Sequence, residues 1–122
     1  MTLEYRYDAS TDVIHVVGYG AVTMQERLAF LHDLHDDPAL PGSAAVMVEV
    51  SGISNPPAAE DMGALSLMVE RLHRRFRGRT AIVNSRVGHA TISCMVAMSV
   101  PGGEEWLRVF LSHADAVRWL TM

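Results

Sequence analysis

Several polar side chains that suit ligand binding follow the carboxyl ends of predicted strands. They are Tyr19, Ser54, Asn55, Asn84, Arg86, His89 and His113. In open parallel sheets, ligands bind in the crevice beyond the carboxyl ends of the strands, so these side chains are candidate binding residues. Arg86 and the helix start at Gly88 would offer an anion a guanidinium together with free backbone amides. The same segment is also typical of a simple turn and helix cap, and that alternative stays open.

A second cluster, His32, His35 and Asp36, has a spacing found in metal sites. The two histidines lie one helical turn apart, and Asp36 follows His32 at i+4 on the same side of a helix. The cluster also falls near the end of a predicted amphipathic helix, where histidines suit the helix dipole and acids keep the outer face hydrated. We favour this second interpretation and predict no metal and no cofactor.

Residues that serve as nucleophiles or bases elsewhere lack the sequence context that catalysis needs. Cys94 lies in an apolar segment with no basic neighbour to stabilise a thiolate, which favours an inert, packed thiol. His15 falls in the middle of a predicted strand, where a histidine is more often packed than catalytic. The chain has no Gly-x-Ser-x-Gly pattern, no His-Glu-x-x-His pattern and no paired cysteines. We predict that the protein is not an enzyme.

Residues 90–100 contain no charged side chain, whereas a surface helix normally has a charged outer face. Such a helix is covered by the core of its own fold, by a second subunit or by an apolar ligand. The candidate interface residues are Ile92, Met95, Val96 and Met98. The leading hypothesis is an interaction module that binds a protein partner, or itself as a homodimer, through this helix. The alternative is a small-ligand carrier that binds an apolar or anionic molecule at the carboxyl ends of the strands.

Charge gives no reason to expect nucleic acid or a membrane as a partner. The formal net charge is −4, which provides no overall attraction to nucleic acid or to an anionic membrane surface. Cations are favourable at the end of a helix, and this is where the basic cluster falls: Arg71, Arg74, Arg75, Arg77 and Arg79. No exposed aromatic platform is interleaved with these arginines, which argues against single-stranded nucleic acid. An acidic protein surface or an anionic ligand stays open as their partner.

Length and composition predict one domain spanning residues 1–122. Apolar residues make up 49% of the chain and charged residues 20%, which is enough for a single hydrophobic core. The single cysteine excludes an internal disulfide and favours a reducing compartment. The chain starts with a charged segment and nowhere reaches about twenty consecutive apolar residues. We therefore expect a cytoplasmic protein.

Local patterns predict alternating strands and helices. An alternating apolar pattern predicts an antiparallel hairpin over residues 3–8 and 13–19, and apolar runs predict strands over residues 44–48, 80–83 and 106–111. Helices are predicted over residues 23–37, 60–77 and 88–100, and from residue 112 onward. Residues 88–100 also fit strand alternation, but their length favours a helix.

The predicted helices carry recognisable ends and buried faces. Thr23 and Glu26 form a capping-box pattern, and Gly78 is expected to end the second helix in a left-handed conformation. The expected buried stripe of the first helix comprises Met24, Leu28, Leu31 and Leu34. That of the second comprises Met62, Leu65, Val69, Leu72 and Phe76.

The resulting order is β-β-α-β-α-β-α-β-α, which predicts an α/β fold. Strand–helix alternation with short connections favours a mostly parallel five-stranded sheet with one antiparallel edge strand and flanking helices. These patterns do not determine the order of the strands in the sheet.

Three short motifs resemble the SpoIIAA-like branch of the STAS family. The first predicted hairpin ends at Gly18-Tyr19-Gly20, before the helix that begins at Thr23. The central strand ends in Glu49-Val50-Ser51-Gly52-Ile53, similar to the Asp-Leu-Ser-Gly-Val segment of anti-sigma factor antagonists. The chain closes with Phe110 and then Ala114-Asp115-Ala116-Val117-Arg118-Trp119-Leu120, similar to the Phe and Glu-Ala-x-x-Trp-Leu ending of the same group. The resemblance implies a STAS fold and a role in binding.

The sequence departs from the antagonists at their phosphorylated serine. In that family the serine follows the central strand and controls partner binding, but here the position falls on Ala58 or Ala59. Neither alanine accepts a phosphate, and Glu60 and Asp61 would repel one. The resemblance therefore does not carry a phosphorylation switch to this chain.

Overall fold

The computed structural model describes residues 3–122 as one five-stranded sheet with four flanking α-helices. The strands are β1 (Leu3–Asp8), β2 (Val13–Gly20), β3 (Ala45–Ile53), β4 (Thr80–Val83) and β5 (Leu107–Phe110). The helices are α1 (Met24–Asp36), α2 (Met62–Arg75), α3 (Val87–Met98) and α4 (His113–Leu120), with 3-10 turns η1 (Ala59–Asp61) and η2 (Gly103–Glu105). The predicted element order is confirmed, and the segment that also fitted a strand is the helix α3.

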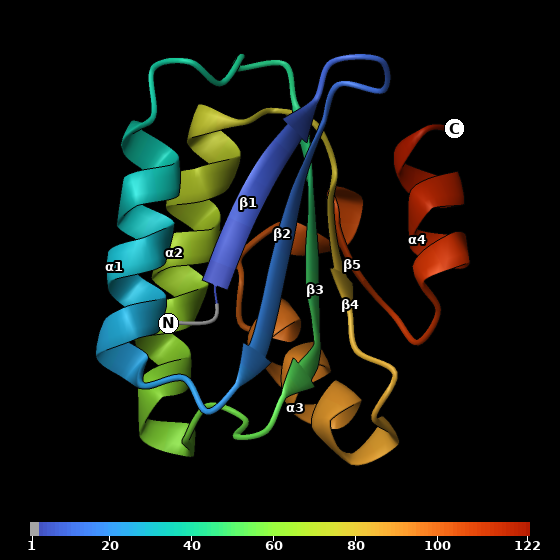
Figure 1. Cartoon of the computed structure of the whole chain (residues 1–122). Helices are drawn as coiled ribbons and strands as arrows, with labels where there is room; N and C mark the ends of the chain where they lie inside the picture. Colours follow the sequence, from blue (N-terminus) through green and yellow to red (C-terminus); the bar gives the residue numbers. More distant parts are fainter. Residues whose placement is uncertain (1–2) are drawn as a thin grey trace.

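The strands lie in the sheet in the same order as in the chain, β1-β2-β3-β4-β5. β1 pairs antiparallel with β2, and the remaining neighbours pair in parallel. This confirms a mostly parallel sheet with one antiparallel edge strand. Each pair of neighbouring parallel strands is joined by a right-handed crossover, and each new strand is added on the same side of the sheet. The helices in these crossovers therefore lie on one face of the sheet. Accordingly, α1 and α2 cover one face and α4 lies against the other (Figure 1).

The main core lies between the sheet and helices α1 and α2. Its buried members are Ile14, Val16, Phe30, Leu34, Leu40, Ala44, Val46, Leu72 and Phe76. The buried residues of α1 are Phe30 and Leu34, and the edge of the Phe30 ring packs against Tyr5 with 5.8 Å between centroids. Of the predicted stripe of α1, only Leu34 is fully buried: the prediction omitted Phe30, and Met24, Leu28 and Leu31 are half-buried.

A second core lies on the opposite face, beneath α4. The buried members are Val13, Ala45, Met47, Ala81, Val83, Ala116 and Trp119. Arg79 and Arg108 each place a guanidinium 5.0 Å from the Trp119 ring centroid, and Arg79 Nη1 also donates to the Trp119 carbonyl oxygen. These contacts fix the last helix against the sheet and account for one member of the basic cluster.

The start of α1 has the cap that the sequence predicts, whereas the residue expected to end α2 has a different conformation from the one predicted. Thr23 Oγ1 accepts from the Glu26 amide, and the Glu26 carboxylate accepts from the Thr23 amide, so the capping box is confirmed. The left-handed conformation expected at Gly78 was wrong, because Gly78 is not among the described residues with positive φ. A Cβ at Gly78 would instead lie 2.7 Å from the Ala44 oxygen and the Ala45 nitrogen. Glycine is needed there so that the two backbone segments can approach closely.

His73 on α2 gives the fold a predicted dependence on pH. Its ring stacks on Trp106 at 3.8 Å between centroids, and its buried Nδ1 has no hydrogen-bond partner in the part of the chain that the structure describes. Burial lowers the pKa of His73 below its ordinary value of 6.5. The neutral ring is therefore favoured in the folded state, and its contribution to stability is complete above that value and lost as the pH falls through the lowered pKa.

We expect the free energy of unfolding to fall between pH 7 and pH 5, and to fall less in His73→Phe, which keeps a ring against Trp106. Urea denaturation of both proteins at each pH measures the difference. Equal losses in the two proteins would show that His73 does not contribute.

Candidate functional site

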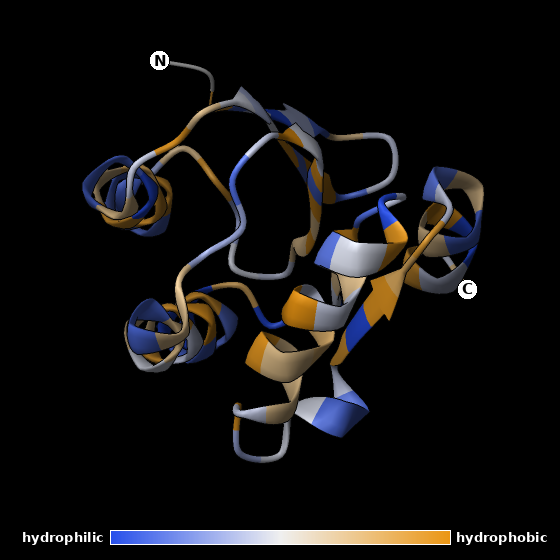
Figure 2. Cartoon of the chain, turned by 90° about the horizontal axis from the view of Figure 1, so that it is seen from below, coloured by the Kyte–Doolittle hydropathy of each residue, from blue (hydrophilic) through white to orange (hydrophobic). Residues whose placement is uncertain are grey.

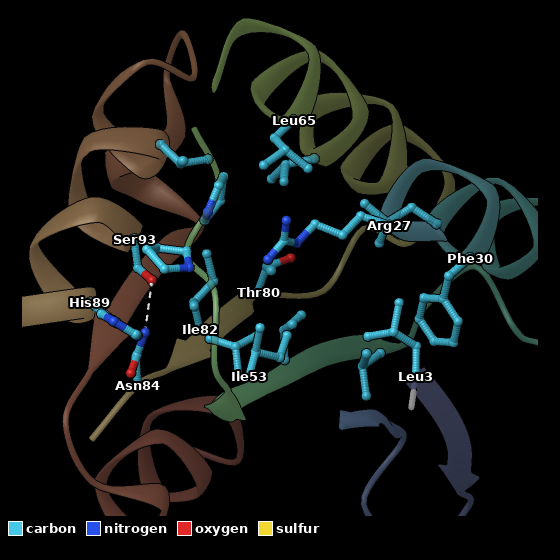
Figure 3. A pocket seen from close by; sticks show the side chains of 18 of the residues that line it. Leu3, Arg27, Phe30, Ile53, Leu65, Thr80, Ile82, Asn84, His89 and Ser93 are labelled. Carbon is cyan, nitrogen blue, oxygen red and sulfur yellow. Dashed lines mark hydrogen bonds between the residues drawn. The ribbon is translucent and has the colours of Figure 1, made fainter. Parts of the chain in front are cut away.

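A cavity of about 150 Å³ lies between the sheet and helices α1, α2 and α3. The sheet contributes Val16, Val46, Val48, Val50 and Ile82, and the helices contribute Phe30, Leu31, Leu65, Val69, Leu72 and Val96. Figure 3 shows side chains from both layers converging on this space. Its wall is almost wholly apolar, and polar side chains enter it at only a few places.

The helical layer is less completely packed toward the carboxyl end of β3, where the cavity lies. Leu34 and Phe76, near the amino end of β3, are fully buried with no exposed surface. Toward the carboxyl end of the same strand, Val48 and Val50 are only half-buried. Protein interiors are normally packed to crystal-like density, whereas this space is partly open to solvent and is bordered by core side chains. An apolar space of this size that reaches the core layer needs a physical reason.

Among residues 3–122, Arg27 is the one charged side chain in the cavity wall. It extends from the first turn of α1 into the space between the helices and the sheet (Figure 3). Its Nη2 donates to the backbone oxygen of Asn55. Burial lowers the pKa of Arg27, and the negative charge of Asp61 opposes that shift.

Asn55 fixes the loop against which Arg27 lies. Its Oδ1 accepts from the Val22 amide at 2.8 Å, and its Nδ2 donates to the Val22 carbonyl oxygen at 2.7 Å. This two-way clamp joins the segment before α1 to the segment after β3. It holds the Asn55 carbonyl, and with it Arg27, at the edge of the cavity.

A second polar corner faces Arg27 from the side of α3. Asn84, which follows β4, is only 4% exposed, and its Nδ2 lies 3.4 Å from Ser93 Oγ. His89, one turn before Ser93, lines the cavity beside this pair (Figure 3). Asn84 Oδ1 accepts from the Arg86 amide at 3.2 Å, which forms a turn just before α3, whose N-cap residue makes no side-chain cap. The turn expected in this segment is therefore present, without a side-chain cap, and Asn84 also borders the cavity.

The structure brings only some of the predicted ligand residues to this cavity. Asn55, Asn84 and His89 lie in its wall, whereas the other four lie outside it: Tyr19, Ser54, Arg86 and His113. The Tyr19 hydroxyl donates to Glu4, and His113 Nδ1 lies 3.9 Å from Glu49 Oε2. Ser54 is exposed and its amide donates to the Gly20 carbonyl oxygen.

Arg27 was not among the predicted site residues, although the sequence carries a signal for it. It precedes Phe30 by three residues, Leu31 by four and Leu34 by seven, so it lies on the buried side of α1. A charged residue in register with an apolar stripe is unusual, because burying a charge without a partner is costly. That pattern points to a functional or structural partner for the guanidinium.

Helix α3 presents apolar side chains both to the cavity and to the outside. Val87, Met95 and Met98 are exposed, at 72%, 49% and 85%. Figure 2 shows that α3 lacks the hydrophilic outer face of α1 and α2. Two predicted interface residues lie elsewhere: Val96 is buried in the cavity wall, and Ile92 is half-buried. The prediction that Cys94 is packed was also wrong, because its thiol is exposed.

The cluster at the end of α1 is an ion-pair group. Asp36 lies 3.1 Å from His32 Nε2 and 2.8 Å from His35 Nδ1, and the hydrogen bond with His35 is the main cause of the lowered pKa of Asp36. Within residues 3–122, no three His, Cys, Asp or Glu side chains are arranged to hold a metal ion. The cluster forms on the exposed surface, as expected for charges at the end of an amphipathic helix.

None of the helices described in residues 3–122 combines the length and the apolar character needed to cross a membrane. Comparison of the sequence with protein-family models and with curated proteins found no match to either.

Proposed function

We propose that this protein is a non-enzymatic binding module that holds a small apolar molecule in the cavity between its sheet and helices α1, α2 and α3. The cavity itself carries the proposal. It measures about 150 Å³, and aliphatic and aromatic side chains make up most of its wall. An engineered cavity of the same volume with a similar lining binds benzene. A molecule of six to eight carbon atoms is the size that would restore normal packing density.

Binding of hexan-1-ol tests this function, because the alcohol is neutral and fits the apolar volume. We expect saturable binding by calorimetry, with the largest NMR shifts at the methyl groups of Val48, Val50 and Val69, which line the cavity. The ligand is small, so a dissociation constant between micromolar and millimolar is expected. An absence of heat, together with unmoved methyl signals at millimolar hexan-1-ol, would contradict the proposed function.

The exposed face of α3 supports a second candidate function, binding to another copy of the chain. Its outer surface carries Met98, Val87 and Met95, and Leu67 on α2 is 64% exposed. Methionine-rich apolar surfaces adapt readily to a partner. The protein would then be an interaction module through α3, with the cavity on the inner side of the same helix.

The double variant Met95→Glu, Met98→Glu is expected to convert a dimer into a monomer, because each carboxylate would be buried in the interface without a counter-ion. Size-exclusion chromatography with light scattering measures the mass. The matched control is Val17→Glu, which adds a charge at another exposed apolar position, on β2. A monomeric wild-type protein at high micromolar concentration would contradict this second function.

We also propose that the chain is a STAS-like module without the phosphorylation switch. The order of strands and helices along the chain is the one that the sequence resemblance implied, and it supports this proposal. Ala58 and Ala59 occupy the region of the switch serine, just before α2. Control by a ligand in the cavity would then take the place of control by phosphate.

A further inference from the structure

We propose that the ligand of the cavity is a small apolar carboxylic acid, with its hydrocarbon part among the valines of the sheet and its carboxylate on Arg27. This inference rests on the proposed function and specifies the chemical class of the ligand. Its basis is a guanidinium in the wall of a mostly apolar space.

The hydrogen-bonding capacity of Arg27 is mostly unused. A guanidinium has five N–H donors in a planar fork, and Arg27 makes one side-chain hydrogen bond in the described chain, to the Asn55 oxygen. Among residues 3–122, no carboxylate lies within the 4.0 Å ion-pair distance of it. Asp61 is near enough to influence Arg27 electrostatically but does not form an ion pair with it. Burial of a cation without a counter-ion is costly, and a ligand carboxylate would remove that cost.

A second guanidinium, that of Arg86, contacts the same loop, although it is exposed and lies outside the cavity wall. Arg86 Nη1 lies 3.4 Å from the Ile53 carbonyl oxygen, and Arg27 donates to the carbonyl oxygen of Asn55, two residues later. Two cations therefore converge on one short loop, and neither is in an ion pair within the described residues. The electrostatic environment of this edge favours an anion over a neutral or cationic group.

The volume and the polar group together define the ligand. The cavity accommodates roughly one benzene-sized group, so the hydrocarbon part has about six to eight carbon atoms, linear or cyclic. A carboxylate matches the fork of one guanidinium in a bidentate pair. A phosphate ester carries more charge and demands more donors than one half-buried arginine supplies.

The test compares hexanoate with hexan-1-ol at pH 7.5, where the acid is ionised, by calorimetry on the full chain. We expect the wild-type protein to bind hexanoate at least about tenfold more tightly than hexan-1-ol, the gain typical of a hydrogen-bonded charge pair. This comparison needs no variant.

Arg27→Gln is expected to lose about tenfold in hexanoate affinity while its hexan-1-ol affinity stays within about threefold. Arg27→Lys should keep part of the preference for the acid.

Arg77→Gln is the matched control. It removes the same charge from an exposed position beyond the end of α2 and should leave both affinities unchanged. Equal binding of acid and alcohol by the wild-type protein would overturn the carboxylate assignment and leave the apolar cavity function intact. Binding of neither molecule would overturn both proposals. Hexyl phosphate binding more tightly than hexanoate would also overturn the carboxylate assignment.

Discussion

Val69→Phe is expected to abolish the binding of hexan-1-ol, weakening it by about a hundredfold or more, while the protein stays at least as stable as the wild type. Val69 is on α2 and faces the cavity. A phenyl ring added at this position occupies the volume that a benzene-sized ligand would take. Side chains that fill a cavity without strain commonly stabilise a protein, so loss of binding and loss of folding can be told apart.

Leu67→Phe is the control for this experiment. It places the same ring on the same helix, at a position that is 64% exposed and therefore outside the cavity. Binding should be unchanged in this variant. Calorimetry gives the affinity and thermal denaturation gives the stability. Unaltered hexan-1-ol binding by Val69→Phe, in a folded protein, would show that the ligand does not occupy this cavity.

The fold was predictable from sequence wherever one local signal determined one element. Thr23 and Glu26 stand at capping-box spacing, and they make that cap in the structure. The prediction of a left-handed conformation at Gly78 was wrong because the glycine is needed for another reason. The sequence shows only that glycine follows a helix, and a left-handed end is the common reason. The actual reason is the distance to Ala44, which depends on how two distant segments approach each other.

The candidate site was predictable only at its polar edge. Asn55, Asn84 and His89 follow strand ends, and the carboxyl ends of parallel strands meet at one edge of the sheet. The cavity behind them depends on the separation between the helices and the sheet, which no local pattern encodes. The sequence also could not predict which face of α3 points inward. This helix is apolar around most of its circumference, so periodicity does not distinguish the inward Val96 from the outward Met98.

If the proposed ligand occupies the cavity, the two ends of the helical layer have different roles, stability at the more tightly packed end and binding at the more open end. At the packed end, Arg75 Nη2 donates to the carbonyl oxygens of Asp37 and Leu40, which ties the end of α2 to the loop after α1. The Arg75 guanidinium also lies 4.5 Å from the centroid of the Phe76 ring. At the open end, Asn55 and Arg27 join the layer through a loop. A fold with one rigid end can leave the other end open for a ligand without losing its unique structure.

Phe76→Ala tests this division and is expected to lower the free energy of unfolding by about 3–5 kcal/mol. The ring has no exposed surface and packs in the core with Leu34 and Leu72, so its removal loses many contacts and leaves a cavity. Val69→Ala removes apolar atoms from the same helix at the open end and should cost only about 1 kcal/mol, because its side chain already borders empty space. Urea denaturation measures both changes. If Val69→Ala cost roughly 2 kcal/mol or more, the loss typical of a fully packed side chain, the cavity end would be packed as tightly as the core, and the physical basis for a ligand there would be lost.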